Sequence, residues 1–521
     1  MTAPPLLADG LLQSAARLPA KTAIIDETSS CTYEQLAEKS SRLAGYLAAH
    51  GIQPGDRVVI FLDNGWPCAA AVYGVLMAGG VFVLVNPQTK SEKLHFILAD
   101  CGATALITDR HLANQYEQAV SGLDRLLLVV SVGTSGTSGV QGTSLMTADL
   151  HEVMSTGPLQ SAPVPRSTSD LAALIYTSGS TGEPKGVMQT QGAMAFAVGS
   201  IIEYLQITAE DRILLVLPMA FDYGLYQVLM SVFLGATVVV ERSFVFLGRV
   251  YEVMRKHKVT VLPGVPTIFS IMQASIAESD LAFPDVRIVT STAAVLHPSL
   301  LPALATLFPN ARIFKMYGLT ECKRVSYLDP DLLADHPESV GIAIPGTTVC
   351  LRDRAGNPVP PGEPGILHVQ GPHIMAGYWN RPEATARMLR TVPETGEVEL
   401  VAQDWFTQDP DGLLYFVGRS DQIIKTRGEK VSPVEVENML CQMDGISQAA
   451  VIGVPDQRLG EQILAYVVAA PDRSLAEGEV RRFCAARLEN FMVPQKIIFL
   501  AELPRTGNNK IDKKLLLEWS V

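Results

Sequence analysis

Short apolar runs that favour strands alternate with longer runs that favour helices through the first 300 residues of the chain. The strand-like runs include Arg57 to Phe61, Ala103 to Thr108, Leu126 to Val130, Ile213 to Leu217, Thr237 to Glu241 and Val259 to Leu262. The helical stretches include Thr32 to His50 and Lys90 to Asp100. Because two parallel strands must be joined by a crossover, usually a helix, this alternation predicts α/β layers on largely parallel sheets.

One segment in this region, Cys68 to Val85, carries no charge and is long enough to cross a membrane. Gly79-Gly80 interrupts it, and the residues that follow are β-branched and aromatic. We therefore expect a buried helix, a turn and a buried strand, with no membrane span.

The pattern changes after about Val340, where short alternating strands are separated by proline and glycine pairs up to Gly418. This pattern predicts a small β-barrel or sandwich. The last 100 or so residues return to a mixed pattern, which predicts a compact α+β domain. Its expected elements are a helix at Pro433 to Gln442, strands at Ala449 to Gly453 and Ile463 to Ala470, a helix at Ala476 to Leu488 and a strand at Lys496 to Leu500.

The composition excludes several classes of protein. The chain has 521 residues, 48% hydrophobic and 18% charged, which is typical of a packed globular protein with roughly three or four folding units. Its net charge of -12 disfavours nucleic acid or an acidic membrane as a partner. The seven scattered cysteines include no Cys-x-x-Cys, so we expect free thiols in a reducing cytoplasm rather than disulfides or structural zinc. We also expect no signal peptide.

A glycine-rich segment, Thr177 to Gly186, reads Thr-Ser-Gly-Ser-Thr-Gly-Glu-Pro-Lys-Gly after an apolar, strand-like run. Such a loop can turn backbone N–H groups and hydroxyls onto one anion, and its lysine adds a positive charge. A polyphosphate is the ligand that this predicts, while a plain surface turn is the alternative. The candidate ligand groups are Thr177, Ser178, Gly179, Ser180, Thr181, Gly182 and Lys185.

The segment is not a Walker A motif, in which a serine or threonine follows the lysine and holds magnesium. Here Pro184 precedes Lys185 and Gly186 follows it. If the loop binds a nucleotide, the metal ion must therefore be held elsewhere in the chain.

Three further motifs occur after the loop. Tyr317-Gly-Leu-Thr-Glu321 places a hydroxyl beside a carboxylate. Asp404-Trp-Phe-Thr-Gln-Asp409 precedes Gly418-Arg-Ser-Asp421, and Pro504-Arg-Thr-Gly-Asn-Asn-Lys510 lies near the end. With the glycine-rich loop, these blocks resemble in order and spacing the adenylate-forming superfamily of acyl- and aryl-CoA ligases, non-ribosomal peptide synthetase adenylation domains and firefly luciferase. The resemblance covers nearly the whole chain.

The resemblance implies a fold and a reaction. The fold would be an N-terminal AMP-binding domain over 1–420, with α/β subdomains at about 1–170 and 171–340 and a β-rich part at about 341–420, and a mobile C-terminal lid over 421–521. A carboxylate would attack the α-phosphate of ATP to give an acyl-adenylate and pyrophosphate. Because two anions repel, the site must neutralise charge in the transition state.

Each motif residue would have a role in this reaction. The glycine-rich loop would hold the β- and γ-phosphates, Thr320 would contact the α-phosphate, and Glu321 would bind Mg²⁺. Tyr317 would lie along the adenine, and Asp409, with Arg419 beside it, would accept hydrogen bonds from the ribose. Lys510 would bridge the α-phosphate and the substrate carboxylate.

The second half-reaction needs a thiol, which the resemblance gives as CoA or the phosphopantetheine of a separate acyl or peptidyl carrier protein. The lid would rotate on a hinge at Asp421, removing Lys510 and bringing in the loop that contains Lys425. Gly428 would then line the thiol tunnel, where any Cβ would narrow the passage.

The small carboxylic acid substrate is indicated by Phe221-Asp222-Tyr223. Amino-acid-activating relatives carry Phe-Asp here, and a buried ammonium requires such a carboxylate. The block also looks like that of free-standing enzymes that load proline onto carrier proteins. We therefore favour an amino acid, with a proline-like acid as one candidate; the alternative is an acyl- or aryl-CoA ligase or acyl-AMP ligase acting on a fatty or aromatic acid. Asp222 could also simply cap the next helix.

The expected pocket wall is Val289 to Leu296, with Tyr223 and Tyr226 opposite and with Ala293 and Ala294 leaving room for the acyl group. The sequence departs from the family at Gln408, at Gln191 in place of a histidine, and at Thr292-Ala293 in place of a glycine pair. Luciferase-like oxidation and binding of an adenylate without turnover are less favoured, because nothing demands a special aromatic substrate and Glu321, Asp409 and Lys510 are all present.

Overall fold

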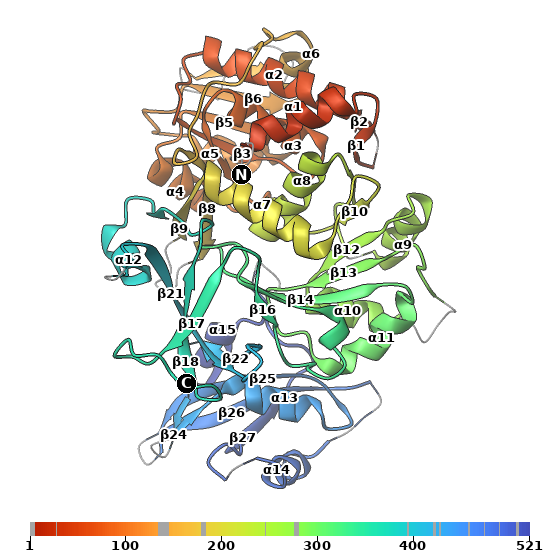
Figure 1. The fold of residues 1–521 in the computed structure, drawn as a ribbon, viewed down its shortest axis with the longest axis vertical. Helices are drawn as coiled ribbons and strands as arrows, with labels where there is room; N and C mark the ends of the chain where they lie inside the picture. Colours follow the sequence, from red (N-terminus) through yellow and green to blue (C-terminus); the bar gives the residue numbers. More distant parts are fainter. Residues whose placement is uncertain are drawn as a thin grey trace.

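The computed structural model describes residues 6–520 except 28, 134–144, 179–183, 245, 276–280, 393–394, 420–421, 423, 427–428, 457–458, 472, 474, 489 and 507–509. Two large sheets, a smaller β-rich sheet and a separate C-terminal sheet with its helices form the molecule (Figure 1). The expected α/β class, with a large N-terminal domain and a small α+β C-terminal domain, is confirmed.

The first sheet has eight strands and a largely parallel centre. In spatial order they are β19 (Gly377–Tyr378), β9 (Pro184–Thr190), β8 (Leu171–Ser178), β4 (Val81–Leu84), β3 (Arg57–Phe61), β5 (Ala105–Asp109), β6 (Leu128–Val132) and β7 (Met146–Asp149). Along β3, Val58 and Ile60 face one hydrophobic core while Val59 and Phe61 face another, as the two-residue repeat of a strand requires.

The second sheet has nine strands. In spatial order they are β16 (Ile342–Ala343), β15 (Ser326–Leu328), β14 (Arg312–Tyr317), β13 (Ile288–Ser291), β12 (Val261–Gly264), β10 (Arg212–Leu215), β11 (Thr237–Val240), β1 (Thr22–Ile25) and β2 (Ser30–Thr32). Strand pairing crosses the boundary expected near residue 170, because β1 and β2 join this sheet and β8 and β9 join the first. The division into 1–170 and 171–340 therefore stays a prediction about folding units and does not describe the sheets.

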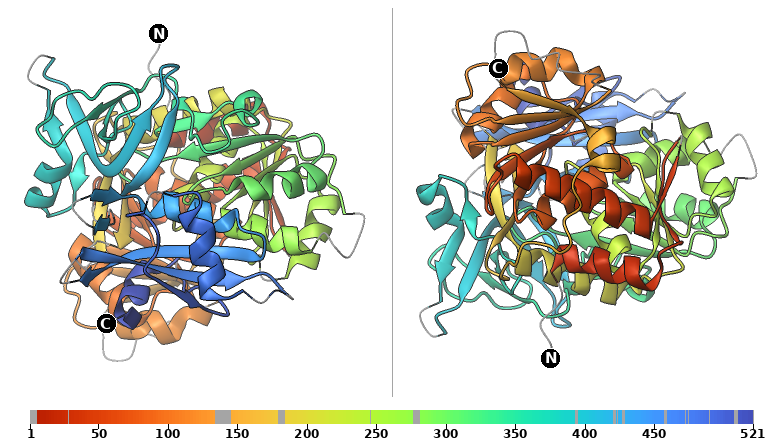
Figure 2. Two further views of the ribbon diagram at one scale, coloured as in Figure 1. Left: turned by 90° about the horizontal axis from the view of Figure 1, so that it is seen from below. Right: turned by 90° about the horizontal axis from the view of Figure 1, so that it is seen from above.

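Helices cover both sheets and also fill the space between them (Figure 1). They are α1 (Leu7–Arg17), α2 (Tyr33–Ala49), α3 (Trp66–Met77), α4 (Ser91–Cys101), α5 (Ala113–Ala119), α6 (Leu150–Thr156), α7 (Gln191–Leu205), α8 (Asp222–Leu234), α9 (Leu247–Lys256), α10 (Pro266–Ala274), α11 (Leu301–Leu307) and α12 (Pro382–Met388). Side chains of α2, α3, α7 and α8 share one core with both sheets, which fixes the sheets relative to each other. The view from above in Figure 2 shows the red and orange N-terminal helices over this region.

The uncharged segment forms a buried helix and strand, as expected. Every residue from Cys68 to Met77 of α3 is buried, and so is all of β4 after the turn at Gly79, whose φ is +76°. No helix among the described residues is both long and apolar enough to cross a bilayer. The seven cysteines all lie in described parts of the chain and are all free.

The β-rich part is an open sheet, so the expectation of a closed barrel is wrong. Its strands are β17 (Thr348–Arg352), β18 (Gly365–Gln370), β21 (Val398–Gln408), β20 (Leu389–Thr391) and β22 (Leu414–Arg419). The eleven-residue β21 pairs with β18, β20 and β22, and the strand path does not return on itself in the described residues. One long central strand with short partners favours an open sheet over closure.

The C-terminal lid has its own core and lies at the lower end of Figure 1, which Figure 2 shows from below. Its elements are β23 (Ile424–Thr426), β24 (Glu429–Val431), α13 (Pro433–Cys441), β25 (Ile446–Asp456), β26 (Gly460–Ala469), α14 (Glu477–Ala485), β27 (Lys496–Phe499) and α15 (Lys513–Ser520). The expected helices and strands are present, and the β23–β24 hairpin is additional.

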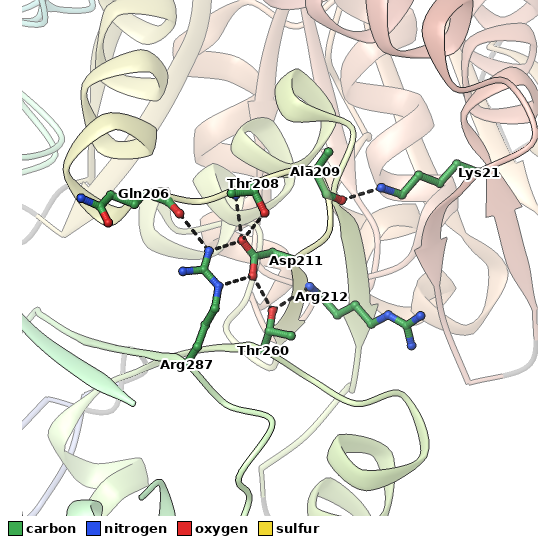
Figure 3. Close-up of polar contacts among 8 residues, drawn as sticks. All are labelled: Lys21, Gln206, Thr208, Ala209, Asp211, Arg212, Thr260 and Arg287. Atoms are coloured by element: carbon green, nitrogen blue, oxygen red, sulfur yellow. Dashed lines mark hydrogen bonds and ion pairs between the residues drawn. The ribbon is translucent and has the colours of Figure 1, made fainter. Parts of the chain in front are cut away.

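A buried polar network ties three strands together at the amino end of the second sheet (Figure 3). Asp211 accepts hydrogen bonds from Arg287 Nε at 2.8 Å, from the Thr260 hydroxyl at 2.7 Å and from the Thr208 backbone N–H at 2.7 Å. Burial alone raises the pKa of Asp211, but these donors outweigh burial and the net pKa is lowered. These residues precede β10, β12 and β13, so the opposite edge remains for a binding site.

Candidate active site

The motif residues converge at the carboxyl ends of the second sheet's strands. Tyr317 ends β14, and Gly318 to Glu321 form the turn that follows. The first residue of α8, Asp222, lies on the same side because α8 follows β10. In α/β sheets this edge is where ligands usually bind.

Lys510 from the lid reaches this edge. The Thr506 N–H donates to the Lys510 carbonyl at 2.8 Å, and a bridge between Arg505 and Ile511 closes the loop that carries Lys510. The Lys510 side chain keeps solvent access, yet surrounding protein atoms desolvate its ammonium. This desolvation lowers the pKa of Lys510.

Four charged groups of the N-terminal domain also act on the Lys510 ammonium. The carboxylates of Asp222, Asp404 and Glu321 raise its pKa, Asp222 most of all, while Arg419 lowers it. Interactions between charges weaken with distance and are screened by salt. The lid orientation therefore gathers the lysine with the residues of three separate motifs.

The lid is held in this orientation by contacts to the N-terminal domain. Arg505 Nη1 donates to the hydroxyl of Thr267 in α10 at 2.8 Å, and the same guanidinium contacts Gln448 of the lid at 3.1 Å. The Ser432 hydroxyl, which caps α13, donates to the backbone carbonyl of Val417 in β22.

Tyr317 lies in an aromatic and acidic setting. Its hydroxyl donates to Asp404, and its ring packs edge-on against Phe406 with centroids 4.8 Å apart. Burial raises the pKa of Tyr317 well above its ordinary value, and the Asp404 carboxylate raises it further, so the hydroxyl stays a donor. Asp404 also pairs with Arg419 Nε at 3.7 Å across the β21–β22 hairpin.

Asp409 is not the carboxylate beside Arg419, so this expectation is wrong. Asp409 lies in the turn after β21, where its carboxylate accepts the N–H of Asp411 at 3.0 Å, the N–H of Leu413 at 2.8 Å and the Tyr415 hydroxyl at 3.1 Å. These contacts shape the hairpin turn. The sequence motif begins with Asp404, and the hairpin register, which places Asp404 opposite Arg419, is the signal that identifies it.

Glu321 and Lys185 meet around Tyr378 of β19. The Tyr378 hydroxyl donates to Glu321 Oε1 at 2.6 Å, and Lys185 Nζ lies 5.7 Å from the Tyr378 ring centroid. The carbonyl of Thr320 accepts a 2.8 Å hydrogen bond from Gln189 Nε2, which fixes the adjoining turn to β9. No sequence motif marked Tyr378 as a site residue. Its strand, β19, pairs with β9, the strand that carries Lys185.

The glycine-rich loop connects β8 and β9. Thr177 pairs with Lys185 and Ser178 pairs with Pro184 in the antiparallel register, so the strand before the loop is confirmed. The candidates Gly179, Ser180, Thr181 and Gly182 lie outside the described residues, and phosphate binding by this loop stays a prediction.

The expected pocket residues come from α8 and β13. Phe221 is the residue before α8, and its side chain makes no cap hydrogen bond. The Tyr223 hydroxyl lies 2.6 Å from Thr290 Oγ1, which confirms contact between Tyr223 and the wall segment. Ala293 and Ala294 are exposed, and Ala293 has a φ of +74°. Glycine adopts this left-handed backbone without strain, whereas other residues adopt it rarely.

A buried lysine that the sequence analysis did not single out pairs with Asp222. Lys323 Nζ lies 3.6 Å from Asp222 Oδ2 and 4.6 Å from the Tyr226 ring centroid. Burial lowers the pKa of Lys323 to about 7, while Asp222 opposes this shift. A cavity of about 10 Å³, room for one water molecule, lies between Lys323, Tyr223 and Tyr226.

The hinge and thiol-tunnel candidates receive little structural description. Asp421 and Gly428 lie outside the described residues. Lys425 is the middle residue of β23 and pairs with Lys430 of β24. Their roles in the second half-reaction stay predictions.

Comparison with known proteins agrees with this architecture. Residues 11–379 match the AMP-binding enzyme family, and residues 435–510 match the AMP-binding enzyme C-terminal domain. A feruloyl-CoA synthase of Amycolatopsis sp is 32% identical over 95% of both chains. A long-chain-fatty-acid–CoA ligase of Bacillus subtilis (strain 168) is 30% identical over 98% of this chain and 93% of its own. The solved structure of o-succinylbenzoate CoA synthetase (MenE) from Bacillus subtilis with an acyl-adenylate intermediate has a TM-score of 0.83 and 28% identity over 97% of both chains.

The fold and the convergence of the motifs define an AMP-forming acid–thiol ligase. The chain belongs to the AMP-binding enzyme family. These relatives support the fatty or aromatic acid alternative more than the favoured amino acid.

Proposed function

We propose that this enzyme uses ATP to adenylate an uncharged fatty or aromatic carboxylic acid and then transfers the acyl group to CoA. The observation that carries the proposal is the position of Lys510, on a lid loop that Arg505 joins to Thr267 of the N-terminal domain at 2.8 Å, where the charges of Asp222, Asp404, Glu321 and Arg419 act on its ammonium. A cation delivered by the lid reduces the repulsion between a carboxylate and the α-phosphate as they approach.

Lys510, Thr320 and Glu321 form the catalytic group in this proposal. Lys510 bridges the two reacting anions, and Thr320 contacts the α-phosphate. The Glu321 carboxylate, oriented by the Tyr378 hydroxyl at 2.6 Å, fits a role as the protein ligand of Mg²⁺. No cluster of three metal-binding side chains occurs among the described residues, which suits an ion held by one carboxylate and substrate phosphates.

In this proposal, the nucleotide binds beside Tyr317 and the aromatic and acidic side chains around it. The Tyr317 ring lies along the adenine, while Thr177, Ser178 and Lys185 flank the phosphates. We assign the ribose to Asp404 in place of Asp409, because Asp404 acts on Lys510 and pairs with Arg419 whereas the Asp409 carboxylate is occupied by its own turn. Ribose hydroxyls that donate hydrogen bonds to this buried carboxylate would be fixed relative to the lysine.

The pairing of Asp222 with Lys323 supports the choice of an uncharged acid. The ammonium of an amino acid would need a buried carboxylate as its partner, and Asp222 already has a protein cation as partner. The names of the relatives point the same way. One observation favours the second candidate, an amino acid, because Asp222 is the carboxylate that acts most strongly on Lys510 and so lies near the reacting carboxylate.

CoA is the proposed acceptor because the relatives are CoA ligases, and a carrier-protein phosphopantetheine is the alternative. The lid over 421–521 rotates at Asp421, which withdraws Lys510 and presents Lys425 and Gly428 to the thiol. The loop contacts of Lys510 lie wholly within the lid, so the lysine moves with it.

The test is exchange of labelled pyrophosphate into ATP, screened over aromatic acids, fatty acids and amino acids. The proposal expects exchange that depends on an uncharged acid, followed by formation of that acid's CoA thioester, detected by mass. Exchange with amino acids alone, or acyl-adenylate that never transfers to CoA, would contradict it.

A further inference from the structure

Asp222, one of the expected substrate-pocket residues, forms an ion pair with Lys323. Their charged atoms are 3.6 Å apart, and the side chains are 22% and 4% exposed respectively. Asp222 is the first residue of α8 and is partly exposed, whereas Lys323 is buried. The Asp222 carboxylate is therefore already paired with a protein cation.

The position of Lys323 is imposed by its backbone. Its φ is +60°, the left-handed region that side chains other than glycine rarely adopt. The turn is closed by Gly318, where an added Cβ would lie 2.2 Å from the Lys323 carbonyl oxygen. A strained, tightly closed turn holds its side chain in one direction, and such residues concentrate at functional sites.

Two tyrosine rings enclose the Lys323 ammonium. The Nζ atom lies 4.6 Å from the Tyr226 centroid and 5.5 Å from the Tyr223 centroid. Tyr223 is in turn fixed by Thr290, whose Oγ1 is 2.6 Å from its hydroxyl. Because a cation is attracted to ring faces, the two rings help to keep the Lys323 ammonium beside Asp222.

We propose that Lys323 is a specificity residue that acts as a built-in ammonium, occupying Asp222 so that acids bearing an ammonium next to the carboxyl group are excluded and uncharged acids are accepted. This inference rests on the proposed adenylation function and deepens it. Lys323 does not touch the reacting atoms; it acts on the substrate through Asp222.

The balance of charge supports exclusion. An α-ammonium would stand next to the carboxylate that Lys510 contacts, and Asp222 is the acid that acts most strongly on Lys510. The buried Arg324, whose Nη1 donates to Thr292 Oγ1 at 2.8 Å, adds another cation to this end of the site. A substrate ammonium beside Asp222 would be one more positive charge near Lys323 and Arg324, and like charges at close range are strongly unfavourable.

The experiment compares matched acids that differ only in the α-amino group, such as 3-phenylpropanoate with phenylalanine and hexanoate with norleucine. Pyrophosphate exchange is measured with the full-length protein at one fixed pH for the parent and every variant. The readout is the ratio of exchange with the amino acid to exchange with its uncharged partner. A ratio is independent of any general loss of activity.

Lys323→Met removes the internal cation and leaves the partly exposed Asp222 carboxylate for a substrate ammonium. We expect this variant to raise the ratio by about ten- to a hundredfold, the effect of one charge-assisted hydrogen bond. The matched double variant Asp222→Asn/Lys323→Met has neither charge and should return the ratio to the low value of the parent protein. If Lys323→Met does not fold, Lys323→Gln makes the same comparison.

Three results overturn the inference in distinguishable ways. An unchanged ratio in Lys323→Met or Lys323→Gln, with exchange on uncharged acids still measurable, overturns the role of Lys323 alone. A gain that persists in the double variant shows that Asp222 does not carry it. A parent protein that uses amino acids, or that shows no exchange with any acid, overturns the proposed function and the inference with it.

Discussion

Arg505 of the lid donates a 2.8 Å hydrogen bond to the hydroxyl of Thr267 in the N-terminal domain. Arg505 lies five residues before Lys510 and bridges to Ile511, so it sits at the base of the loop that carries the catalytic lysine. The same guanidinium contacts Gln448 within the lid. One arginine thus links the lid's own sheet, the lysine loop and the large domain.

We predict that Thr267→Val slows adenylation by about three- to tenfold, because it removes one exposed, charge-assisted hydrogen bond that holds the adenylating orientation. Thioester formation from supplied acyl-adenylate and CoA should stay the same. Gln448→Ala is the control, since its bond lies inside the lid and does not join the domains. A Thr267→Val enzyme impaired equally in both half-reactions would mean that the contact serves general stability.

Asp404 and Asp409 of the β21–β22 hairpin should have different roles, one in ATP binding and one in stability. Asp404→Asn should raise the KM for ATP by about ten- to a hundredfold, because the buried carboxylate pairs with Arg419 and accepts the Tyr317 hydroxyl. Asp409→Ala should leave the KM for ATP nearly unchanged and lower the free energy of unfolding by about 1–2 kcal/mol through loss of its turn contacts. Steady-state kinetics and urea unfolding of both variants test the assignment, which the reverse pattern would contradict.

The Asp211 network predicts a pH-dependent contribution to stability (Figure 3). The folded-state pKa of Asp211 lies below its unfolded value of 3.8, so its contribution is fully present above that value and is lost as the pH falls through the folded pKa. Asp211→Asn should cost about 3 kcal/mol near neutral pH, because it leaves Arg287 without its buried partner.

This cost should be constant from pH 8 to pH 5 and shrink only below about pH 4. Urea unfolding of the parent protein and the variant across that range measures the difference. A cost that changes between pH 5 and pH 8 would show that another group dominates.

Ala293 and Ala294 are adjacent and both exposed, but of these two residues Ala293 alone has a positive φ, at +74°. A β-branched side chain is strongly disfavoured in this region, so Ala293→Val should lower the free energy of unfolding by about 2 kcal/mol more than Ala294→Val. Thermal unfolding of the two variants compares them directly. Equal effects would show that backbone strain at residue 293 is not the cause.

The sequence predicted the features that depend on local pattern. The alternation of strands and helices, the buried α3 and β4, and the motif residues Tyr317, Glu321 and Lys510 all follow from nearby residues. The open β-rich sheet, the exchange of β1 and β2 with β8 and β9 between sheets, and the Lys323–Asp222 pair depend on contacts between distant segments. From the sequence we expected Arg419 beside Asp409, whereas the structure places Arg419 opposite Asp404. Spacing alone does not reveal which residue of a hairpin faces its partner strand.

Separate assays of the two half-reactions in Lys510→Ala, made with the acid identified by exchange, test whether the lid delivers the cation for adenylation. The account predicts a loss of adenylation of about 100- to 1,000-fold, the effect of removing one preorganised charge, while thioester formation from supplied adenylate and CoA stays within about threefold of the parent enzyme. An equal loss of both half-reactions, or adenylation that survives without Lys510, would contradict delivery of this cation by the lid.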